Sequence, residues 1–178
     1  MNTNKNNTNG INIRPALAMY HANAKGTGCA IRFELHPAEV AMEGYVAMSL
    51  APQITIGNRI GPNPTFPRFD WENRIDVRLY FKDIAQMLQV LRGECESITD
   101  GKGLYFRSTA GSTVVRFAHI IDPVSGYVLD VSHSPADGSD KRMARFLMDP
   151  AEALGVCEAF VGCMYLVAFG IPRIANVG

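Results

Sequence analysis

Cationic and aromatic residues recur together in the first half of this sequence, a combination that can bind a polyanion. Lys25 and Gly26 lie in a run of small residues that leads into an alternating segment. A phosphate could approach such a backbone closely, held by the ammonium group and by free backbone N–H groups. The other candidate residues share outward positions on expected strands or beside them: Arg32, Tyr45, Trp71, Arg74, Arg78 and Tyr80.

Interleaved cations and aromatic rings suit a single-stranded nucleic acid, because bases stack on the rings while phosphates contact the cations. The alternative interpretation is that these arginines are solvated side chains, as on any antiparallel sheet. The sequence has 17 Lys and Arg residues against 17 Asp and Glu, so its net charge provides no overall field to attract nucleic acid. Any anion-binding surface is therefore expected to be local.

Catalytic and metal-binding motifs are missing from the sequence. It has no G-x-S-x-G elbow, H-E-x-x-H helix, Walker loop or paired-carboxylate signature, and its 4 histidines are dispersed. The 4 cysteines include no C-x-x-C pair, which argues against a zinc site and favours reduced thiols. Residues 100–103, Asp-Gly-Lys-Gly, resemble a phosphate loop but precede a strand, so we interpret them as a hairpin turn. We therefore expect a protein that is not an enzyme and has no cofactor or metal.

Residues 69–93 are expected to form a strand that runs directly into a helix. Apolar and charged residues alternate over 74–81, the period of a strand with one buried face. The apolar period then becomes helical. Asp83 and Gln86 look like a capping box, which would place the helix start at Asp83, and Gly93 suits the helix end.

The same change of period recurs near the end of the chain. Residues 143–148 alternate, and Asp149 then opens a long apolar run. Aligning Asp83 with Asp149 sets Gln86 against Glu152, which indicates two copies of a unit in which strands are followed by a helix. Two ordinary helix starts are the alternative explanation.

Alternation predicts further strands at 29–35, 45–51, 104–107, 113–121 and 126–131. Because strands dominate and a helix closes each group, the expected class is α+β with antiparallel sheets, not a parallel βαβ sheet. The proline-rich segment 53–68 is interpreted as a long excursion without regular structure. The Asn-rich residues 1–10 are expected to form a disordered tail, and residues 11–178 a single domain.

The last helix, expected at 150–169, is apolar around nearly its whole circumference. A chain of 178 residues is not expected to cover all of it, so we predict an oligomer whose interface includes Leu154, Phe160, Met164 and Phe169. The most apolar run, 159–171, has 13 residues, too few to span a bilayer. We expect no membrane partner and, because no signal or transit segment opens the sequence, a cytoplasmic protein.

Several ordered segments resemble the Whirly family of single-stranded DNA-binding proteins, whose fold is shared by the kinetoplastid guide-RNA-binding proteins. Residues 25–30, Lys-Gly-Thr-Gly-Cys-Ala, are similar to the family's lysine-glycine-lysine-alanine-alanine-leucine strand. Residues 43–52 resemble its glycine-phenylalanine strand ending in alanine-proline, and Phe-Asp-Trp at 69–71 resembles its tyrosine-aspartate-tryptophan. The resemblance covers residues 20–169. Thr27 departs from it, standing where the family has its second lysine.

The resemblance implies two four-stranded antiparallel sheets, each followed by a helix, in a ββββα repeat. It also implies a tetramer assembled through its helices, with single-stranded DNA along the sheet edges. The missing organelle-targeting segment suggests a bacterial or phage relative, nucleoid-associated if it binds DNA. We therefore expect a largely sequence-tolerant single-stranded DNA-binding protein that protects or organises strands in replication, recombination or repair. The alternatives are an RNA-binding annealing factor of the same fold and an oligomeric interaction scaffold that binds no nucleic acid.

Overall fold

The structure, a computed structural model, describes residues 16–58, 60, 62–122 and 125–171, and the predicted tail at 1–10 lies outside them. The first sheet and its helix are formed by β1 (Ala16–His21), β2 (Cys29–His36), β3 (Tyr45–Thr55), β4 (Arg68–Phe69), β5 (Ile75–Leu79) and α1 (Phe81–Leu91). The second group contains β6 (Leu104–Ser108), β7 (Gly111–Ile120), β8 (Gly126–Pro135), β9 (Arg142–Met148) and α2 (Pro150–Phe169).

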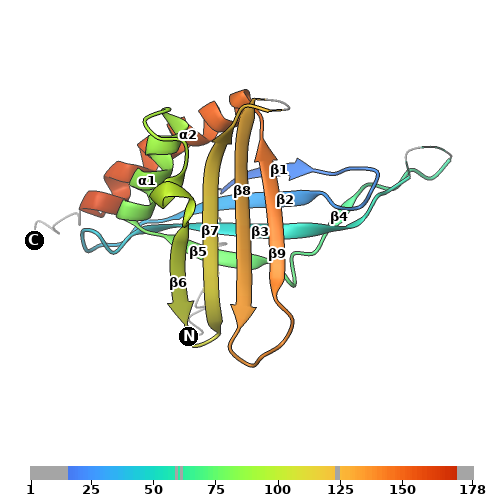
Figure 1. Cartoon of the computed structure of the whole chain (residues 1–178), viewed down its shortest axis with the longest axis horizontal. Helices are drawn as coiled ribbons and strands as arrows, with labels where there is room; N and C mark the ends of the chain where they lie inside the picture. The colour runs from blue at the N-terminus through green and yellow to red at the C-terminus, as the bar shows by residue number, and fades with distance from the viewer. Residues whose placement is uncertain (1–15, 59, 61, 123–124, 172–178) are drawn as a thin grey trace, which may run out of the picture.

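These two groups confirm the predicted α+β class, with antiparallel sheets and a helix after each sheet (Figure 1). β3 is the centre of the first sheet, because it pairs with β2 on one side and with β4 and β5 on the other. The second sheet has the order β6-β7-β8-β9. The first sheet differs from the expectation of four strands, since the short β4 makes it five-stranded in the described part of the chain.

The core lies between the two sheets, whose strands cross steeply in Figure 1. The inner face of the first sheet contributes Ile31, Met48 and Val77, and that of the second contributes Phe117 and Phe146, all buried. Successive side chains of a strand point to opposite faces. The same alternation therefore places the charged and aromatic residues of β2, β3 and β5 on the outer face of the first sheet.

The start of α1 differs from the sequence prediction. The helix begins at Phe81, Tyr80 is the N-cap residue, and Asp83 is the third helical residue. The Asp83 carboxylate accepts a hydrogen bond from the Tyr80 N–H at 3.0 Å, so Asp83 has the role that we gave to Gln86. The predicted helix end is confirmed, because Gly93 follows the C-cap residue with a positive φ of 71°.

The observed start of α1 also changes which residues of the two units correspond. α2 has Asp149 at its N-cap and Glu152 at its third position, with the Glu152 N–H donating to Asp149 Oδ1 at 2.8 Å. Tyr80 therefore corresponds to Asp149, and Asp83 corresponds to Glu152, a shift of three residues from the sequence alignment. Each unit has the same junction, in which one capping residue separates the last strand from the helix.

α2 has the predicted bounds, but one of its predicted interface residues is buried. Phe160 is 1% exposed, and its ring meets that of Phe33 at right angles with 5.2 Å between centroids. The prediction that Phe160 contacts another subunit is therefore wrong, because the core of its own chain already covers it. Leu154 and Phe169 are 62% and 69% exposed, and Met164 is partly buried.

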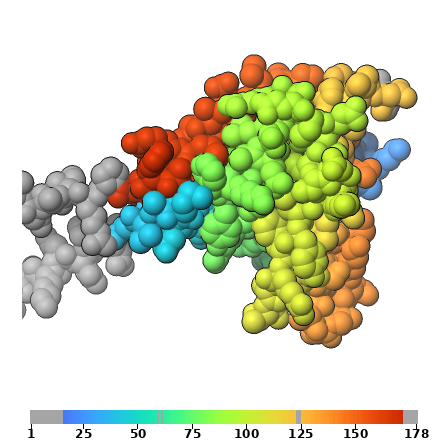
Figure 2. All heavy atoms as spheres, turned by 60° about the vertical axis from the view of Figure 1, so that its left-hand side comes forward, coloured from blue at the N-terminus to red at the C-terminus, as the bar shows by residue number. Residues whose placement is uncertain are grey.

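Figure 2 shows α2 lying along the outside of the molecule. The helix has 20 residues and contains an 18-residue window with a mean hydropathy of 1.6, so its length and composition would allow it to cross a bilayer. The 13-residue estimate was too short because the apolar helix begins at Pro150.

The proline-rich segment is more regular than predicted. β3 continues to Thr55, pairs with β4, and is followed by an antiparallel bridge between Asn58 and Thr65. The segment is therefore a hairpin arm that projects beyond the sheet (Figure 1), with Ile60 and Phe66 exposed on it. A pattern search misses this arm because three prolines interrupt its alternation.

Residues 100–103 do not form the predicted hairpin turn. They lie at the end of a short 3₁₀ helix (Ile98–Gly101) that connects α1 to β6. Thr99 and Asp100 have positive φ values of 48° and 51°, and Gly101 and Gly103 follow with 80° and 85°. A tight left-handed connection explains the glycines without a phosphate.

Gln53 is a buried polar residue that joins three segments of the first sheet. Its Oε1 accepts hydrogen bonds from the N–H groups of Asn23 and Gly28, at 2.9 and 3.1 Å. Its Nε2 donates to the carbonyls of Asn23 and Thr55, at 3.1 and 2.9 Å. Gln53 thereby fixes the β1–β2 connection against β3, near the base of the hairpin arm.

We predict that Gln53→Ala lowers the free energy of unfolding by about 1–3 kcal/mol, because it removes four part-buried hydrogen bonds to backbone groups. Urea denaturation followed by circular dichroism measures the change. The matched control is Gln89→Ala on the exposed face of α1, which should change stability by less than about 0.5 kcal/mol. Equal stability of the two variants would show that the Gln53 contacts do not fix this connection.

Candidate functional site

The outer face of the first sheet brings together most of the residues predicted to bind. The strand register places Arg32 opposite Ser49 and Ser49 opposite Asp76. The next row places Ala47 opposite Arg78. The face therefore presents charged side chains over a floor of small residues, in a hollow of about 360 Å³.

The Tyr45 ring lies between the side chains of His36 and Arg78 on this face. The His36 ring stacks on it at 4.6 Å with 13° between the planes, and the Arg78 guanidinium lies 5.0 Å from its centroid. His36 comes from β2 and Arg78 from β5, so they approach the ring from the strands on either side of β3. Tyr80 contacts Tyr45 at 5.8 Å and is 41% exposed. Tyr45 thus positions its neighbours, and Tyr80 offers the more accessible ring.

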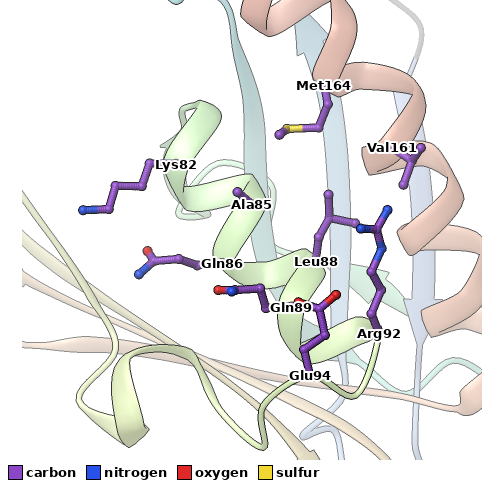
Figure 3. A pocket seen from close by; sticks show the side chains of 9 residues that line it. All are labelled: Lys82, Ala85, Gln86, Leu88, Gln89, Arg92, Glu94, Val161 and Met164. Carbon is purple, nitrogen blue, oxygen red and sulfur yellow. The ribbon is translucent and has the colours of Figure 1, made fainter.

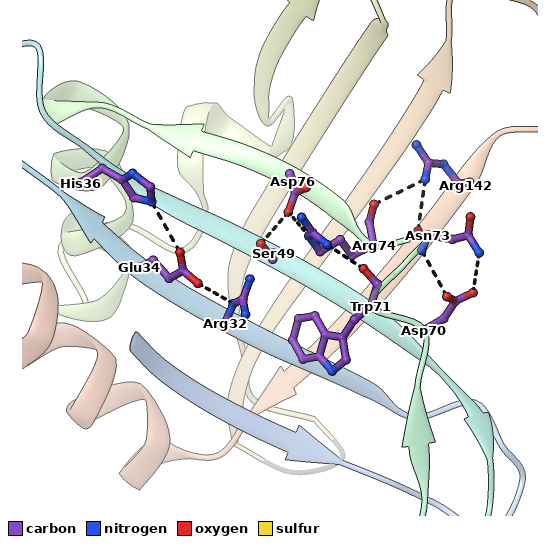
Figure 4. A network of polar contacts seen from close by, with 10 residues as sticks. All are labelled: Arg32, Glu34, His36, Ser49, Asp70, Trp71, Asn73, Arg74, Asp76 and Arg142. Atoms are coloured by element: carbon purple, nitrogen blue, oxygen red, sulfur yellow. Dashed lines mark hydrogen bonds and ion pairs between the residues drawn. The ribbon is translucent and has the colours of Figure 1, made fainter. Parts of the chain in front are cut away.

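A second arginine and aromatic pair lies farther along the sheet. The Arg32 guanidinium lies 5.2 Å from the centroid of the Trp71 ring (Figure 4). Arg32 Nε also lies 2.9 Å from Glu34 Oε1, an ion pair that lacks hydrogen-bond alignment. The same Glu34 carboxylate is 3.5 Å from His36 Nε2. Glu34 therefore links the two aromatic clusters.

The turn that carries Trp71 is held by several polar contacts (Figure 4). Asp70 accepts hydrogen bonds from the side-chain and backbone N–H groups of Asn73, which lower the pKa of its carboxyl group. Arg74 donates to the Trp71 carbonyl at 2.8 Å, and Arg142 of β9 donates to the Asn73 carbonyl at 3.1 Å. Trp71 is therefore presented from a fixed backbone.

The arginines of this face differ in how far their charges are neutralised. Arg32 pairs with Glu34, and Arg74 Nε pairs with Asp76 at 2.9 Å. Arg78, in contrast, has no carboxylate partner within the described part of the chain and rests on the Tyr45 ring. Of these three arginines, Arg78 is therefore the one whose charge no carboxylate of the described residues neutralises.

Lys25 and Gly26 do not form the predicted phosphate cradle. They lie in the turn between β1 and β2, where Asn23 Oδ1 accepts hydrogen bonds from the N–H groups of Lys25 and Thr27, at 3.0 and 3.1 Å. The Gly26 N–H donates to the Asn23 carbonyl at 3.2 Å. These groups are not free for a phosphate, so only the exposed ammonium of Lys25 remains available.

The site is therefore a line of residues and not a single pocket. Tyr45 and Tyr80 lie at one end of the sheet, and the Lys25 turn lies at the other, about 26 Å away along an eight-residue strand. Sequence reasoning missed His36, Tyr20 and Phe69. His36 was visible as an outward position of β2, whereas Tyr20 and Phe69 meet only through the pairing of distant strands.

Two groups of the first unit have raised pKa values, and burial is the main cause of both shifts. Burial raises the pKa of the Cys29 thiol to about 11, so it is protonated at neutral pH and is not a nucleophile. Burial also raises the pKa of Asp83, which is a helix-capping residue. Among the described residues, no three His, Cys, Asp or Glu side chains come together as metal ligands.

A separate hollow of about 580 Å³ lies between α1 and α2 (Figure 3). Leu88, Val161 and Met164 supply its apolar part, and Lys82 and Arg92 are among the polar residues at its edge. It is formed by the helices and is distinct from the outer face of the first sheet. Its apolar part adjoins the exposed side of α2.

Comparison with solved structures identifies the fold. WHY3 from Arabidopsis thaliana matches with a TM-score of 0.67 and 16% identity, over 87% of this chain and 89% of that one. The plant transcriptional regulator PBF-2 matches with a TM-score of 0.66 and 15% identity, over 87% of this chain and 82% of that one. A guide-RNA-binding protein complex bound to a gRNA matches with a TM-score of 0.60 and 17% identity, over 86% of this chain and 92% of that one.

The chain therefore has the Whirly fold, which the sequence resemblance implied. At these identities the likeness shows the fold alone. No family model matches the sequence, and no curated protein matches it.

We predict that Arg78 and Tyr45 stabilise each other by about 0.5–1 kcal/mol, the magnitude of an exposed cation–π contact. A double-mutant cycle of Arg78→Met and Tyr45→Leu, measured by urea unfolding, gives this coupling energy. The control cycle combines Arg78→Met with Tyr105→Leu on the second sheet and should be additive. Additivity in both cycles would contradict the contact.

Proposed function

We propose that this protein binds single-stranded DNA, largely without sequence preference, along the outer face of its first sheet. The observation that carries the proposal is the pairing of Arg78 with Tyr45 and of Arg32 with Trp71, beside the accessible ring of Tyr80. Aromatic rings orient the guanidinium groups, and exposed rings offer stacking surfaces. Base stacking contributes about 1–3 kcal/mol per base in such sites, and every base can supply it.

The distribution of charges supports binding through a few local contacts to a strand, and not through a net electrostatic attraction of the whole protein. The whole chain has no net charge, and most cations of the face are paired with carboxylates. Binding would therefore depend on a few phosphate contacts, with Arg78 and Lys25 among the cations that have no carboxylate partner in the described residues. Bases of a duplex are already stacked and cannot reach these rings, so unpaired strands are favoured.

The cellular role follows from this activity as a further proposal. A sequence-tolerant binder would protect or organise single strands in replication, recombination or repair, in the cytoplasm of a bacterium or during phage growth. We propose no catalytic step. On this face the Ser49 hydroxyl donates to Asp76 Oδ1 at 2.6 Å, and Arg74 Nε binds the same carboxylate oxygen at 2.9 Å, so the Asp76 carboxylate is held in an ion pair.

An RNA ligand is the second candidate, favoured by the match to a guide-RNA-binding protein complex bound to a gRNA. Fluorescence anisotropy with DNA and RNA strands of the same sequence separates the two, since only contacts to the 2′-hydroxyl favour RNA directly. A matched duplex completes the series. Failure to bind any of the three at low salt would instead support an interaction scaffold.

We predict that Arg78→Met weakens binding to single-stranded DNA and reduces the slope of log affinity against log salt by about 0.7, the value for one phosphate contact. Anisotropy titrations at several salt concentrations measure both effects. The control is Arg145→Met, because Arg145 lies on the second sheet and is bound by the Asp130 carboxylate at 2.6 and 2.8 Å. An equal loss of slope in both variants would mean that the first sheet is not the binding face.

We also propose that the exposed side of α2 packs against other copies of the chain, in a tetramer. Leu154, Tyr165 and Phe169 are more than 60% exposed on this helix. The apolar part of the hollow between the helices, Val161 and Met164, continues the same surface. Burial of this stripe by protein would remove apolar area from water, and we favour that explanation of its hydropathy over a membrane contact.

We predict that Leu154→Asp dissociates the oligomer and leaves the protomer folded, because Leu154 contacts solvent in the single chain. Phe160→Asp should instead unfold the protomer, at a cost above about 3 kcal/mol, since it places a carboxylate in the core. Light scattering measures mass, and circular dichroism measures folding. A folded monomer of wild-type sequence would refute the proposed assembly.

A further inference from the structure

A third hollow lies at the base of the hairpin arm, beyond the Arg32 and Trp71 pair. It has a volume of about 620 Å³ and is lined by Tyr20, Ala22, Pro67, Arg68, Phe69 and Trp71. These residues come from the end of β1, from β4 and from the turn before β5. The hollow is therefore assembled from two segments, 20–22 and 67–71, that adjoin in the fold and are distant in sequence.

Three aromatic rings meet in this hollow at steep angles. Tyr20 and Phe69 have 5.6 Å between their ring centroids and 56° between their planes. The ring centroids of Tyr20 and Trp71 are 6.3 Å apart, and their planes make an angle of 75°. Tyr20 remains 57% exposed in spite of these contacts. A flat aromatic group that entered could stack on one ring and meet another at its edge, both favourable geometries.

The charges around the hollow indicate which flat group it takes. Arg32 lies over the Trp71 ring, and Arg68 is exposed at the hollow with no carboxylate partner among the described residues. The neighbouring Asp70 carboxylate is bound by Asn73. Accessible cations beside aromatic walls complement a ligand that joins a planar ring to an anion, and a nucleotide has this chemistry.

We infer that this hollow receives one unpaired nucleobase of the bound strand, with Arg68 contacting the adjoining phosphate. The inference rests on the proposed function and adds a residue-level subsite to it. A base enters only after it leaves its stack, which costs a few kcal/mol in a duplex and less in a flexible strand. The pocket thereby favours unpaired strands over duplex DNA.

Trp71 is the single tryptophan of the chain, so its fluorescence reports on this pocket alone. Titration of the full chain with oligothymidylate should quench Trp71 emission over the same concentration range that raises the anisotropy of the labelled strand. A strand of abasic sugar phosphates of equal length should bind more weakly and leave the emission unchanged. A hairpin duplex should also leave the emission unchanged.

Tyr20→Ala and Phe69→Ala should each weaken oligothymidylate binding about 5-fold or more, the loss of one stacking contact. Tyr20 is exposed, so its variant is expected to fold even if the Phe69 variant does not. Tyr105→Ala, an exposed tyrosine on the second sheet, is the matched control and should bind as the wild type does.

Two failures are distinguishable. If the strand binds while Trp71 emission stays constant and Tyr20→Ala retains wild-type affinity, the base pocket is overturned and the proposed function stands. If no single strand raises the anisotropy, both the pocket and the proposed function are overturned.

Discussion

The structure depends on the pairing of β3 with strands on both of its sides. β3 fixes β2 along one edge and β5 along the other, and its extension with β4 forms the hairpin arm. Because side chains alternate along a strand, this register places apolar residues in the core and lines up the outer residues in cross-strand rows. A one-residue slip of β3 would move Tyr45 into the core and separate it from Arg78 and His36. The candidate binding face is thus a consequence of strand register.

Local patterns in the sequence were sufficient for the fold class, most strand positions and both bounds of α2. They failed at the start of α1 and where the structure depends on contacts between distant segments. The capping of α1 by Asp83 was misassigned, because a carboxylate can serve at the N-cap or at the third helical position. Phe160 looked like an interface residue because helix periodicity does not reveal which faces the same chain covers.

In the candidate site, too, local patterns predicted some residues, and contacts between other segments decided the rest. Arg32, Arg78 and Tyr80 were found because outward positions follow from alternation, whereas Trp71 was found as an aromatic residue beside the expected strand and lies in the turn before β5. The cradle at Lys25 was not present, since Asn23 occupies the backbone groups that the sequence had left free. Tyr20 and Phe69 were missed because their rings, on β1 and β4, come into contact only in the folded sheet, and no local pattern encodes that contact.

The proposed function requires that the few accessible cations of a neutral protein lie beside exposed aromatic rings. The outer face of the first sheet has Arg78 over the Tyr45 ring, whereas the second sheet neutralises Arg145 with Asp130. The most direct test is photo-cross-linking with a strand containing 5-iodouracil, followed by mass spectrometry. The account predicts cross-links to Tyr20, Phe69, Trp71 and Tyr80. Cross-links confined to Tyr105 on the second sheet, or to Tyr165 on α2, would contradict it.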